Sequence, residues 1–250
     1  TATSDNWVVK EFSKSNIMGF YRGPNIVTDG LVLALDAAPP KSYPGTGTTW
    51  YDLSGNGNNG SLVNGVSYSN SNSGLLEFDG TDDYTEVSDS ATIDITGPIS
   101  MEIVFKTVSE SVTERLIDKT TSGGTYGYGY NLARYSTDRM LATYNNGNTR
   151  IFLYSNYKAS DFFSNFTHVI YAYDGADSQK MWINGIDESG QNSFTSNFVA
   201  GSTSGTDLDL MRRGGEYAEG DVAFFRFYNK ALSAQEVYQN YNATKSRFGL

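Results

Sequence analysis

Short apolar segments, each bounded by turn residues, recur along the chain from Asp29 onward. The segment LVLALD at residues 31–36 is apolar on both faces, as in a strand that is buried on two sides. An Asn-Gly pair, Asn146–Gly147, lies between MLATY and RIFLY and predicts a hairpin. Further runs of this kind lie at residues 74–78, 100–106, 167–173, 179–186 and 221–229. This spacing predicts about a dozen strands and an all-β sandwich or barrel.

The period within one of these segments supports the same conclusion. In SMEIVFK, Met101, Ile103 and Phe105 share one face of an extended chain, while Glu102 and Lys106 occupy the other. The chain contains 18 Tyr, 14 Phe and 26 Gly, and only 18% of its residues are charged. Such a balance is typical of strands joined by many turns.

Charge and composition exclude several classes of function. The net charge of −10 argues against nonspecific binding of nucleic acid, which needs a basic surface. The chain has no cysteine, so disulfides and thiolate metal sites are excluded. No apolar run approaches the roughly 20 residues of a membrane span, and the N-terminal residues lack the pattern of a secretory signal. We therefore expect neither nucleic acid nor membrane as a partner.

One segment near the C-terminus predicts a short helix. Ser233 and Glu236 have the spacing of a capping box, and Leu232 and Val237 occupy the positions of a hydrophobic staple. Tyr241 lies one turn after Val237, so both side chains can face the sheet.

The segment GNGNNG at residues 55–60 fits the glycine pattern of dinucleotide-binding folds. That pattern requires a buried strand before the first glycine and a helix after the third. The preceding TTWYDLS is too polar for a central strand, and the following SLVNGVSY has no helical period. We therefore interpret the segment as a surface loop whose glycines adopt positive φ.

Residues 1–28 differ from the rest of the chain, because they follow neither a helical nor a strand period. They nevertheless contain six large apolar side chains: Trp7, Phe12, Ile17, Met18, Phe20 and Tyr21. Either the segment is a frayed tail, or it is an arm that packs on its own domain or on a neighbouring subunit. We favour the arm, with Trp7, Phe12 and Phe20 as anchoring residues, and place the folded domain at residues 29–250.

A cluster of aspartates in the segment FDGTDDY is the candidate metal site. Asp79, Asp82 and Asp83 lie within five positions, and calcium prefers carboxylate and carbonyl oxygens. Asp and Gly are also the residues that a turn without metal prefers. A structural calcium ion held by these three residues is the one cofactor that the sequence suggests.

Signals for catalysis are weak. The single histidine, His168, begins a predicted strand, and no G-x-S-x-G segment supplies an exposed serine. A hydrogen-bonded strand histidine is the better interpretation. The carboxylates of GIDESG and GGEYAEGD could be imagined as a glycosidase pair, but turn residues explain them better. We expect no catalytic residue.

Tyrosines in the segment GGTYGYGYNLARY are candidates for contact with a glycan. Tyr126, Tyr128 and Tyr130 fall on one face of an extended chain, with glycines between them. Sugar rings stack on such exposed aromatic side chains. The alternative is a strand whose tyrosines cover the sheet.

Several segments, in their order along the chain, resemble the laminin-G-like, concanavalin-A-like jelly-roll superfamily. They include LLEFDGTDDYTEV, SMEIVFKT, FTHVIYAYDGADSQKMWINGI and GDVAFFRFYNKALSAQEVYQNYNA. The resemblance implies a two-sheet antiparallel jelly-roll sandwich with one short C-terminal helix. It also implies a binding or structural role without catalysis, in which loops at one edge can bind calcium or glycans.

The segments around GPNIVTDGLVLALDA and NATKSRFGL are similar to those of virion proteins of tailed bacteriophages. This similarity implies a structural protein on the virion surface, in capsid decoration or in a tail or fibre. Its partners would be other virion proteins and further copies of itself. A binding module that recognises host surface polysaccharide is the alternative, and a polysaccharide hydrolase is a third.

Overall fold

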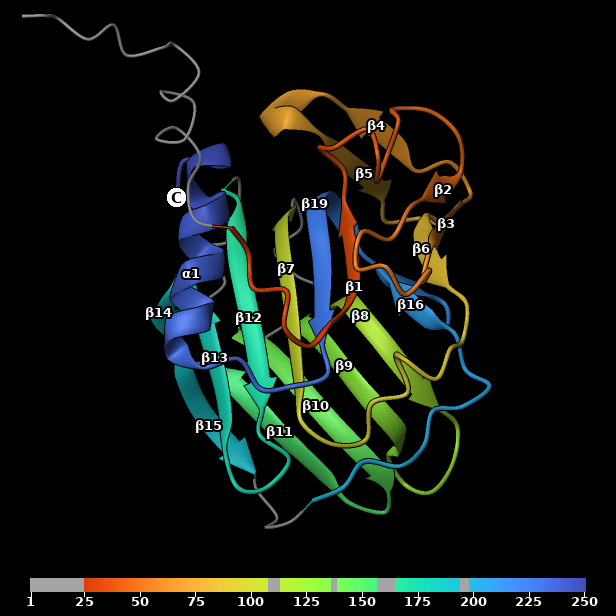
Figure 1. Ribbon diagram of the computed structural model, residues 1–250. Helices are drawn as coiled ribbons and strands as arrows, with labels where there is room; N and C mark the ends of the chain where they lie inside the picture. The colour runs from red at the N-terminus through yellow and green to blue at the C-terminus, as the bar shows by residue number, and fades with distance from the viewer. Residues whose placement is uncertain (1–24, 108–112, 136–138, 157–164, 194–197) are drawn as a thin grey trace, which may run out of the picture.

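Two antiparallel sheets lie face to face in the computed structural model, as Figure 1 shows. The structure describes residues 25–107, 113–135, 139–156, 165–193 and 198–250. Strands make up most of the regular structure, and one α-helix, α1 (Ala234–Thr244), follows the last strand. The predicted all-β sandwich with a short C-terminal helix is confirmed.

The first sheet, sheet A, is the layer that carries the helix on its outer face (Figure 1). In spatial order it contains β14 (Ile186–Asp187), β13 (Gln179–Ile183), β12 (Thr167–Tyr173), β7 (Ile99–Thr107), β19 (Glu219–Tyr228), β5 (Leu75–Asp79) and β4 (Ser67–Ser69). The first residues of β19 pair with β5, and its last residues pair with β1 (Leu31–Asp36).

The second sheet, sheet B, forms the other layer. In spatial order it contains β15 (Ser189–Ser193), β11 (Arg150–Ser155), β10 (Arg139–Gly147), β9 (Gly127–Tyr135), β8 (Glu114–Thr121), β16 (Leu208–Leu210), β6 (Tyr84–Val87), β3 (Gly60–Val63) and β2 (Thr49–Trp50). A small hairpin of β17 (Arg212–Arg213) and β18 (Glu216–Tyr217) follows β16. Two 3₁₀ turns, η2 (Ser71–Ser73) and η4 (Lys245–Arg247), complete the described elements.

Side-chain alternation along the strands fills the space between the sheets. On β7 the side chains of Met101, Ile103 and Phe105 all enter the main core, as the sequence predicts. Large aromatic rings, among them Trp50 and Phe225, are fully buried in the same core. Burial of this apolar area is the main favourable term in the stability of the sandwich.

Helix α1 covers the outer face of sheet A. The side chain of Ser233 accepts a hydrogen bond from the Glu236 backbone, and the Glu236 side chain accepts one from the Ser233 backbone. This is the predicted capping box, and it fixes where the helix begins. Leu232 and Val237 are both buried against the sheet, so the predicted staple is also confirmed.

A fully buried carboxylate, that of Glu102, ties the helix to the sheet. Its Oε1 accepts a hydrogen bond from Nη1 of Arg226 at 2.9 Å and lies 2.8 Å from Nε2 of His168. Its Oε2 accepts one from Nδ2 of Asn240, in α1, at 2.8 Å. Burial pushes the pKa of Glu102 up, but Arg226 and His168 outweigh burial and hold it below its ordinary value. The alternation of the sequence predicts that Glu102 lies on the polar, outer face of its strand. Helix α1 covers that face, so Glu102 is buried.

Residues 55–59 of the GNGNNG segment form a loop between β2 and β3, as the sequence predicts, whereas Gly60 is the buried first residue of β3. Gly55 and Gly57 have φ of 90° and 78°, which other residues adopt at a cost. The carboxylate of Asp52 accepts a hydrogen bond from the backbone of Asn58, whose buried side chain donates to the Val32 carbonyl at 2.8 Å. The loop is therefore fastened to β1 by side chains and shows no helix that could face a phosphate.

The first described residues lie against helix α1. Gln239 donates to the Asn25 carbonyl, and the backbone of Val27 donates to Oδ1 of Asn240. Val27 is buried in the apolar cluster beneath the helix. The anchoring candidates Trp7, Phe12 and Phe20 lie outside the described residues, so the division into an arm and a domain at residue 28 stays a prediction. No helix in the described ranges is long and apolar enough to cross a membrane.

Candidate functional site

The outer face of sheet B carries an unbroken row of side chains, all of them polar except Phe152. Cross-strand partners lie on the same face of a sheet, so the register identifies the members of this row. From one edge of the sheet to the other they are Ser193, Phe152, Thr143, Asn131, Asp118, Asp209, Glu86, Ser61 and Thr49. We call this set the polar row. No helix covers this face in the described part of the chain. Thr143, Asn131 and Asp118 at its centre are only 3–5% exposed, whereas Phe152 and Asp209 are half-buried and keep surface that a ligand can contact.

Aromatic side chains lie in and beside the polar row, on β11, at the end of β9 and just before its start, and we call them the aromatic strip. Its members are Tyr126, Phe152, Tyr154 and Tyr135, together with Arg150. Ring centroids of Phe152 and Tyr154 are 5.4 Å apart, and those of Tyr154 and Tyr135 are 5.9 Å apart. The Arg150 guanidinium lies 5.0 Å from the Tyr126 ring centroid. All three rings of Phe152, Tyr154 and Tyr135 are half-buried, so each keeps part of its surface in solvent.

Only part of the predicted tyrosine set belongs to this strip. Tyr126 is 41% exposed, as a contact residue requires. Tyr128 is half-buried, and its ring fills the space above Gly147 and Gly201.

Tyr130 is fully buried, so the prediction of a glycan contact is wrong for this residue. It pairs in register with Tyr144, which places its ring in the core, where its hydroxyl donates to the Ile93 carbonyl at 2.9 Å. For Tyr130 the alternative interpretation, a strand tyrosine that packs on the sheet, is the correct one.

A hollow of about 290 Å³ opens beside the polar row where β8 meets β16. Asp118, Asp207, Asp209 and Arg213 supply its charged groups, and Thr120 contributes a hydroxyl. Thr120 donates to Oδ1 of Asp118 at 2.6 Å, and Oδ2 of Asp118 lies 3.3 Å from Nε of Arg213. We call this feature the Asp118 hollow.

Two of the carboxyl groups in the Asp118 hollow have raised pKa values. Burial raises the pKa of Asp118 to about 6, against the pull of Thr120 and Arg213 in the other direction. Burial also raises the pKa of Asp209, although Arg212 lies 2.8–2.9 Å from both of its oxygens. Such carboxyl groups in a cleft are candidates for a functional site.

Three buried acceptors on this face receive no hydrogen bond from the described residues: Oδ2 of Asp118, Oδ1 of Asn131 and Oδ1 of Asn145. Asp118 and Asn131 are direct cross-strand partners. The amide groups of Asn131 and Asn145 both lie within hydrogen-bond distance of the Thr143 hydroxyl, at 2.6 and 3.5 Å. Buried acceptors of this kind need a donor from water or from a ligand.

The three predicted calcium ligands lie close together in the turn after β5. Ligand oxygens of Asp79, Asp82 and Asp83 are all within 4.8 Å of one another. Hydrogen bonds from the backbone, chiefly that of Thr81, lower the pKa of Asp79, and burial raises that of Asp83. The same hydrogen bonds also close a turn, so calcium binding here stays a prediction.

His168 has the structural role that the sequence suggests. Its ring is buried, bonds to Glu102 and stacks on Tyr241 at 5.8 Å.

Three of the five carboxylates in GIDESG and GGEYAEGD lie in ion pairs. Asp187 pairs with Lys180, Glu216 with Arg115 and Asp221 with Lys106.

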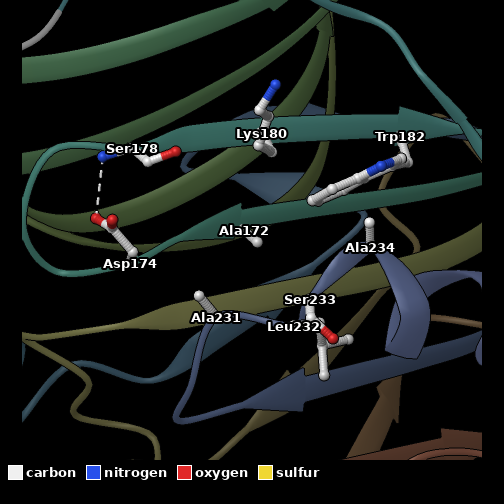
Figure 2. A pocket seen from close by; sticks show the side chains of 9 residues that line it. All are labelled: Ala172, Asp174, Ser178, Lys180, Trp182, Ala231, Leu232, Ser233 and Ala234. Carbon is white, nitrogen blue, oxygen red and sulfur yellow. Dashed lines mark hydrogen bonds between the residues drawn. The ribbon is translucent and has the colours of Figure 1, made fainter.

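A second hollow, of about 340 Å³, lies on the opposite side of the molecule between β12, β13 and the start of α1. Figure 2 shows its lining, with Trp182 and Lys180 on β13 and Ala231 to Ala234 leading into the helix. Trp182 is only 8% exposed, so little of its ring can contact a ligand. Oδ1 of Asp174 already accepts three backbone hydrogen bonds within its own turn. The outer face of sheet B is therefore the stronger candidate.

A family model described as the concanavalin A-like lectin/glucanases superfamily matches residues 79–238, which is more than half of the chain. The chain belongs to this superfamily. The match runs from the end of β5 into α1, so it includes every strand that carries the aromatic strip and the Asp118 hollow. No curated protein matches the sequence.

Solved structures of low sequence identity share the fold of this superfamily member. The binding domain of Paraclostridial Mosquitocidal Protein 1 superposes with a TM-score of 0.67 at 14% identity, over 86% of this chain and 52% of that one. The binding domain of botulinum neurotoxin DC in complex with SialylT gives 0.68 at 14%, over 87% and 52%. Trypanosoma rangeli sialidase in complex with sialic acid gives 0.62 at 12%, over 88% and 34%. The chain thus spans about half the length of each toxin domain and about a third of the length of the sialidase.

Sequence reasoning missed the polar row and Asp118. The segment ERLIDKTT of β8 contains four charged residues in eight, and a register shift between Arg115 and Ile117 interrupts its alternation. Leu116 and Ile117 are the only apolar residues in this segment. The partial exposure of Phe152 and Tyr154 could have been predicted from the sequence, because both alternate with the core residues of β11.

Proposed function

We propose that this chain is a non-catalytic carbohydrate-binding module whose ligand lies on the outer face of sheet B. The observation that carries this proposal is the aromatic strip beside the polar row, on a face that no described helix covers. A pyranose ring has one apolar face, which stacks on Phe or Tyr, and an edge of hydroxyl groups, which bond to polar side chains. Phe152 and Tyr154 supply the first kind of contact, and the half-buried Asp209 and Arg213 of the Asp118 hollow supply the second.

The structural relatives support the proposal indirectly. Two of them are described as complexes with SialylT and with sialic acid, and both share the sandwich. Because their identity to this chain is 12–14%, the sugar ligands belong to those proteins and suggest only a class of ligand here.

The test is a glycan array followed by matched aromatic variants. We expect the wild-type protein to bind at least one surface polysaccharide, and Tyr154→Ala to weaken that binding about ten-fold, because stacked aromatic contacts are worth about 1 kcal/mol or more. Tyr238→Ala is the control, since Tyr238 lies on α1, on the opposite face, and is 58% exposed. Binding to no glycan, or equal loss in both variants, would count against the proposal.

We also propose that the module is displayed on the surface of a tailed-phage particle, in capsid decoration or in a tail or fibre. The sequence resemblance to virion proteins supports this role, and so do the apolar residues Trp7, Phe12 and Phe20 ahead of the domain. Residues 25–27 lie against α1, on the side away from the aromatic strip. An arm that starts there would leave the outer face of sheet B free while it contacts other virion proteins or further copies of this chain.

Deletion of residues 1–24 tests the virion role, and it spares Val27, which packs under the helix. We expect the shortened protein to fold and to be absent from assembled particles, as measured by mass spectrometry of purified virions. Normal incorporation of the shortened protein would refute the anchoring role.

A further inference from the structure

We propose that the sugar bound at the Asp118 hollow is uncharged, and that the site rejects sugars that carry a carboxylate. This inference rests on the proposed carbohydrate-binding function and adds to it the chemical class of the ligand. It distinguishes this chain from the relative whose complex contains sialic acid, an acidic sugar.

The charges around the hollow are the first argument. Three carboxyl groups, those of Asp118, Asp207 and Asp209, line it against the guanidinium of Arg213. The guanidinium of Arg212 is already engaged by both oxygens of Asp209 and stacks over the Tyr84 ring at 3.5 Å. A ligand carboxylate in the hollow would meet an excess of negative charge, and like charges at contact distance in a partly buried site repel strongly.

The hydrogen-bonding groups give a second, independent argument. Three buried atoms on this face receive no hydrogen bond from the described residues, one each on Asp118, Asn131 and Asn145, and all three are acceptors. That of Asp118 lies in an ion pair with Arg213 at 3.3 Å. Hydroxyl groups of an uncharged sugar are donors and can satisfy such acceptors. A carboxylate in place of a hydroxymethyl group removes one donor and adds only acceptors, so an acidic sugar has one group fewer that can satisfy these atoms, and its carboxylate loses hydration in the hollow.

The charged groups of the hollow and the buried acceptors lie on the same outer face of sheet B. Asp118 both lines the hollow and carries one of the three buried acceptors. Asn131, which carries another, lies directly opposite it in the β8–β9 ladder. Phe152 lies in the same row, two strands beyond Asn131, so a short oligosaccharide can reach both the hollow and the aromatic strip.

The experiment compares each of three neutral homopolymers, a glucan, a mannan and a galactan, with its own C6-oxidised form on one array that also carries sialylated glycans. Oxidation replaces the CH₂OH group by a carboxylate and leaves the linkage unchanged. We expect retention of at least one neutral polymer and about ten-fold or weaker binding of its oxidised form. Equal or tighter binding of the oxidised polymer, or retention of sialylated glycans alone, would overturn this inference and leave the proposed function standing. Retention of no glycan would overturn both.

Two isosteric variants test whether the neutral sugar binds at the Asp118 hollow. Asp118→Asn keeps the size of the side chain and replaces one carboxylate oxygen by an amide donor, so binding of the neutral polymer should fall about ten-fold or more. Asp187→Asn removes the same charge from an exposed ion pair on sheet A and should leave the affinity unchanged. Unchanged binding by Asp118→Asn would place the sugar elsewhere and overturn the assignment to the hollow.

Discussion

Asp118 on β8 and Asn131 on β9 lie directly opposite each other on the outer face of sheet B, and each keeps one buried oxygen that accepts no hydrogen bond from the described residues. A buried polar atom without a partner costs about 1–3 kcal/mol. Oδ1 of Asn131 carries this cost, whereas the ion pair with Arg213 at 3.3 Å offsets part of it for Oδ2 of Asp118. A ligand that donates hydrogen bonds to both oxygens would stabilise the fold.

Asp118→Asn should stabilise the protein at neutral pH while it weakens glycan binding. The pKa of Asp118 is raised from 3.8 to about 6, so the unfolded chain loses this proton at lower pH than the folded one. Ionisation therefore costs the fold up to about 3 kcal/mol once the pH exceeds the folded pKa. We expect denaturant unfolding to show a gain of about 1–2 kcal/mol at pH 7, after the loss of the Arg213 ion pair is subtracted.

The pH dependence provides the check on this explanation. The gain should shrink as the pH falls from about 6 to about 4, because the folded wild-type protein then holds the proton on Asp118 and the unfolded chain approaches its own pKa of 3.8. A variant that is less stable than wild type at both pH values would contradict the raised pKa.

Glu102→Gln should destabilise the protein by about 3 kcal/mol, because it leaves the buried Arg226 guanidinium without its main partner. The pKa of Glu102 lies below its ordinary value, so its contribution is present at neutral pH and is lost as the pH falls through the folded pKa. Urea denaturation at several pH values measures both effects. Glu219→Gln is the control, since Glu219 is exposed, and a similar loss in both variants would refute the role of the buried network.

Ser233→Ala should cost about 1 kcal/mol, because it removes the side-chain half of the capping box that starts α1. Thermal and urea unfolding both measure this change. Ser246→Ala, at an exposed position in η4, is the matched control and should change little. Equal stability of the two variants would mean that helix capping adds nothing to the docking of α1.

Calcium should raise the melting temperature if Asp79, Asp82 and Asp83 bind it, because a ligand that binds only the folded state stabilises it. The measurement is a thermal melt with added calcium and with a chelator. Asp82→Asn should reduce the shift, since Asp82 is exposed and can be changed with little effect on the fold. Identical melting temperatures in calcium and in chelator would dismiss the site.

Local patterns predict much of this fold, and long-range pairing explains what they miss. Alternation in SMEIVFK and the Ser233–Glu236 spacing depend on neighbours within a few residues, and the structure confirms both. The burial of Tyr130 depends on its register with Tyr144, and that of Glu102 on a helix some 130 residues later.

The candidate site also depends on long-range strand pairing, which local sequence patterns do not report. Tyr126 was predicted from its own segment, but the polar row arises only when nine strands align, with each contributing one residue. The members of that row are separated by up to 144 residues in the sequence, from Thr49 to Ser193, so no local period reports them.

The most direct test of the central claim is to map the bound glycan by amide chemical shifts in NMR spectra. With the tightest-binding neutral glycan added, the account predicts shifts on β8 to β11, centred on Asp118, Asn131, Thr143 and Phe152. Shifts confined to Trp182, the start of α1 and the hollow of Figure 2 would contradict it.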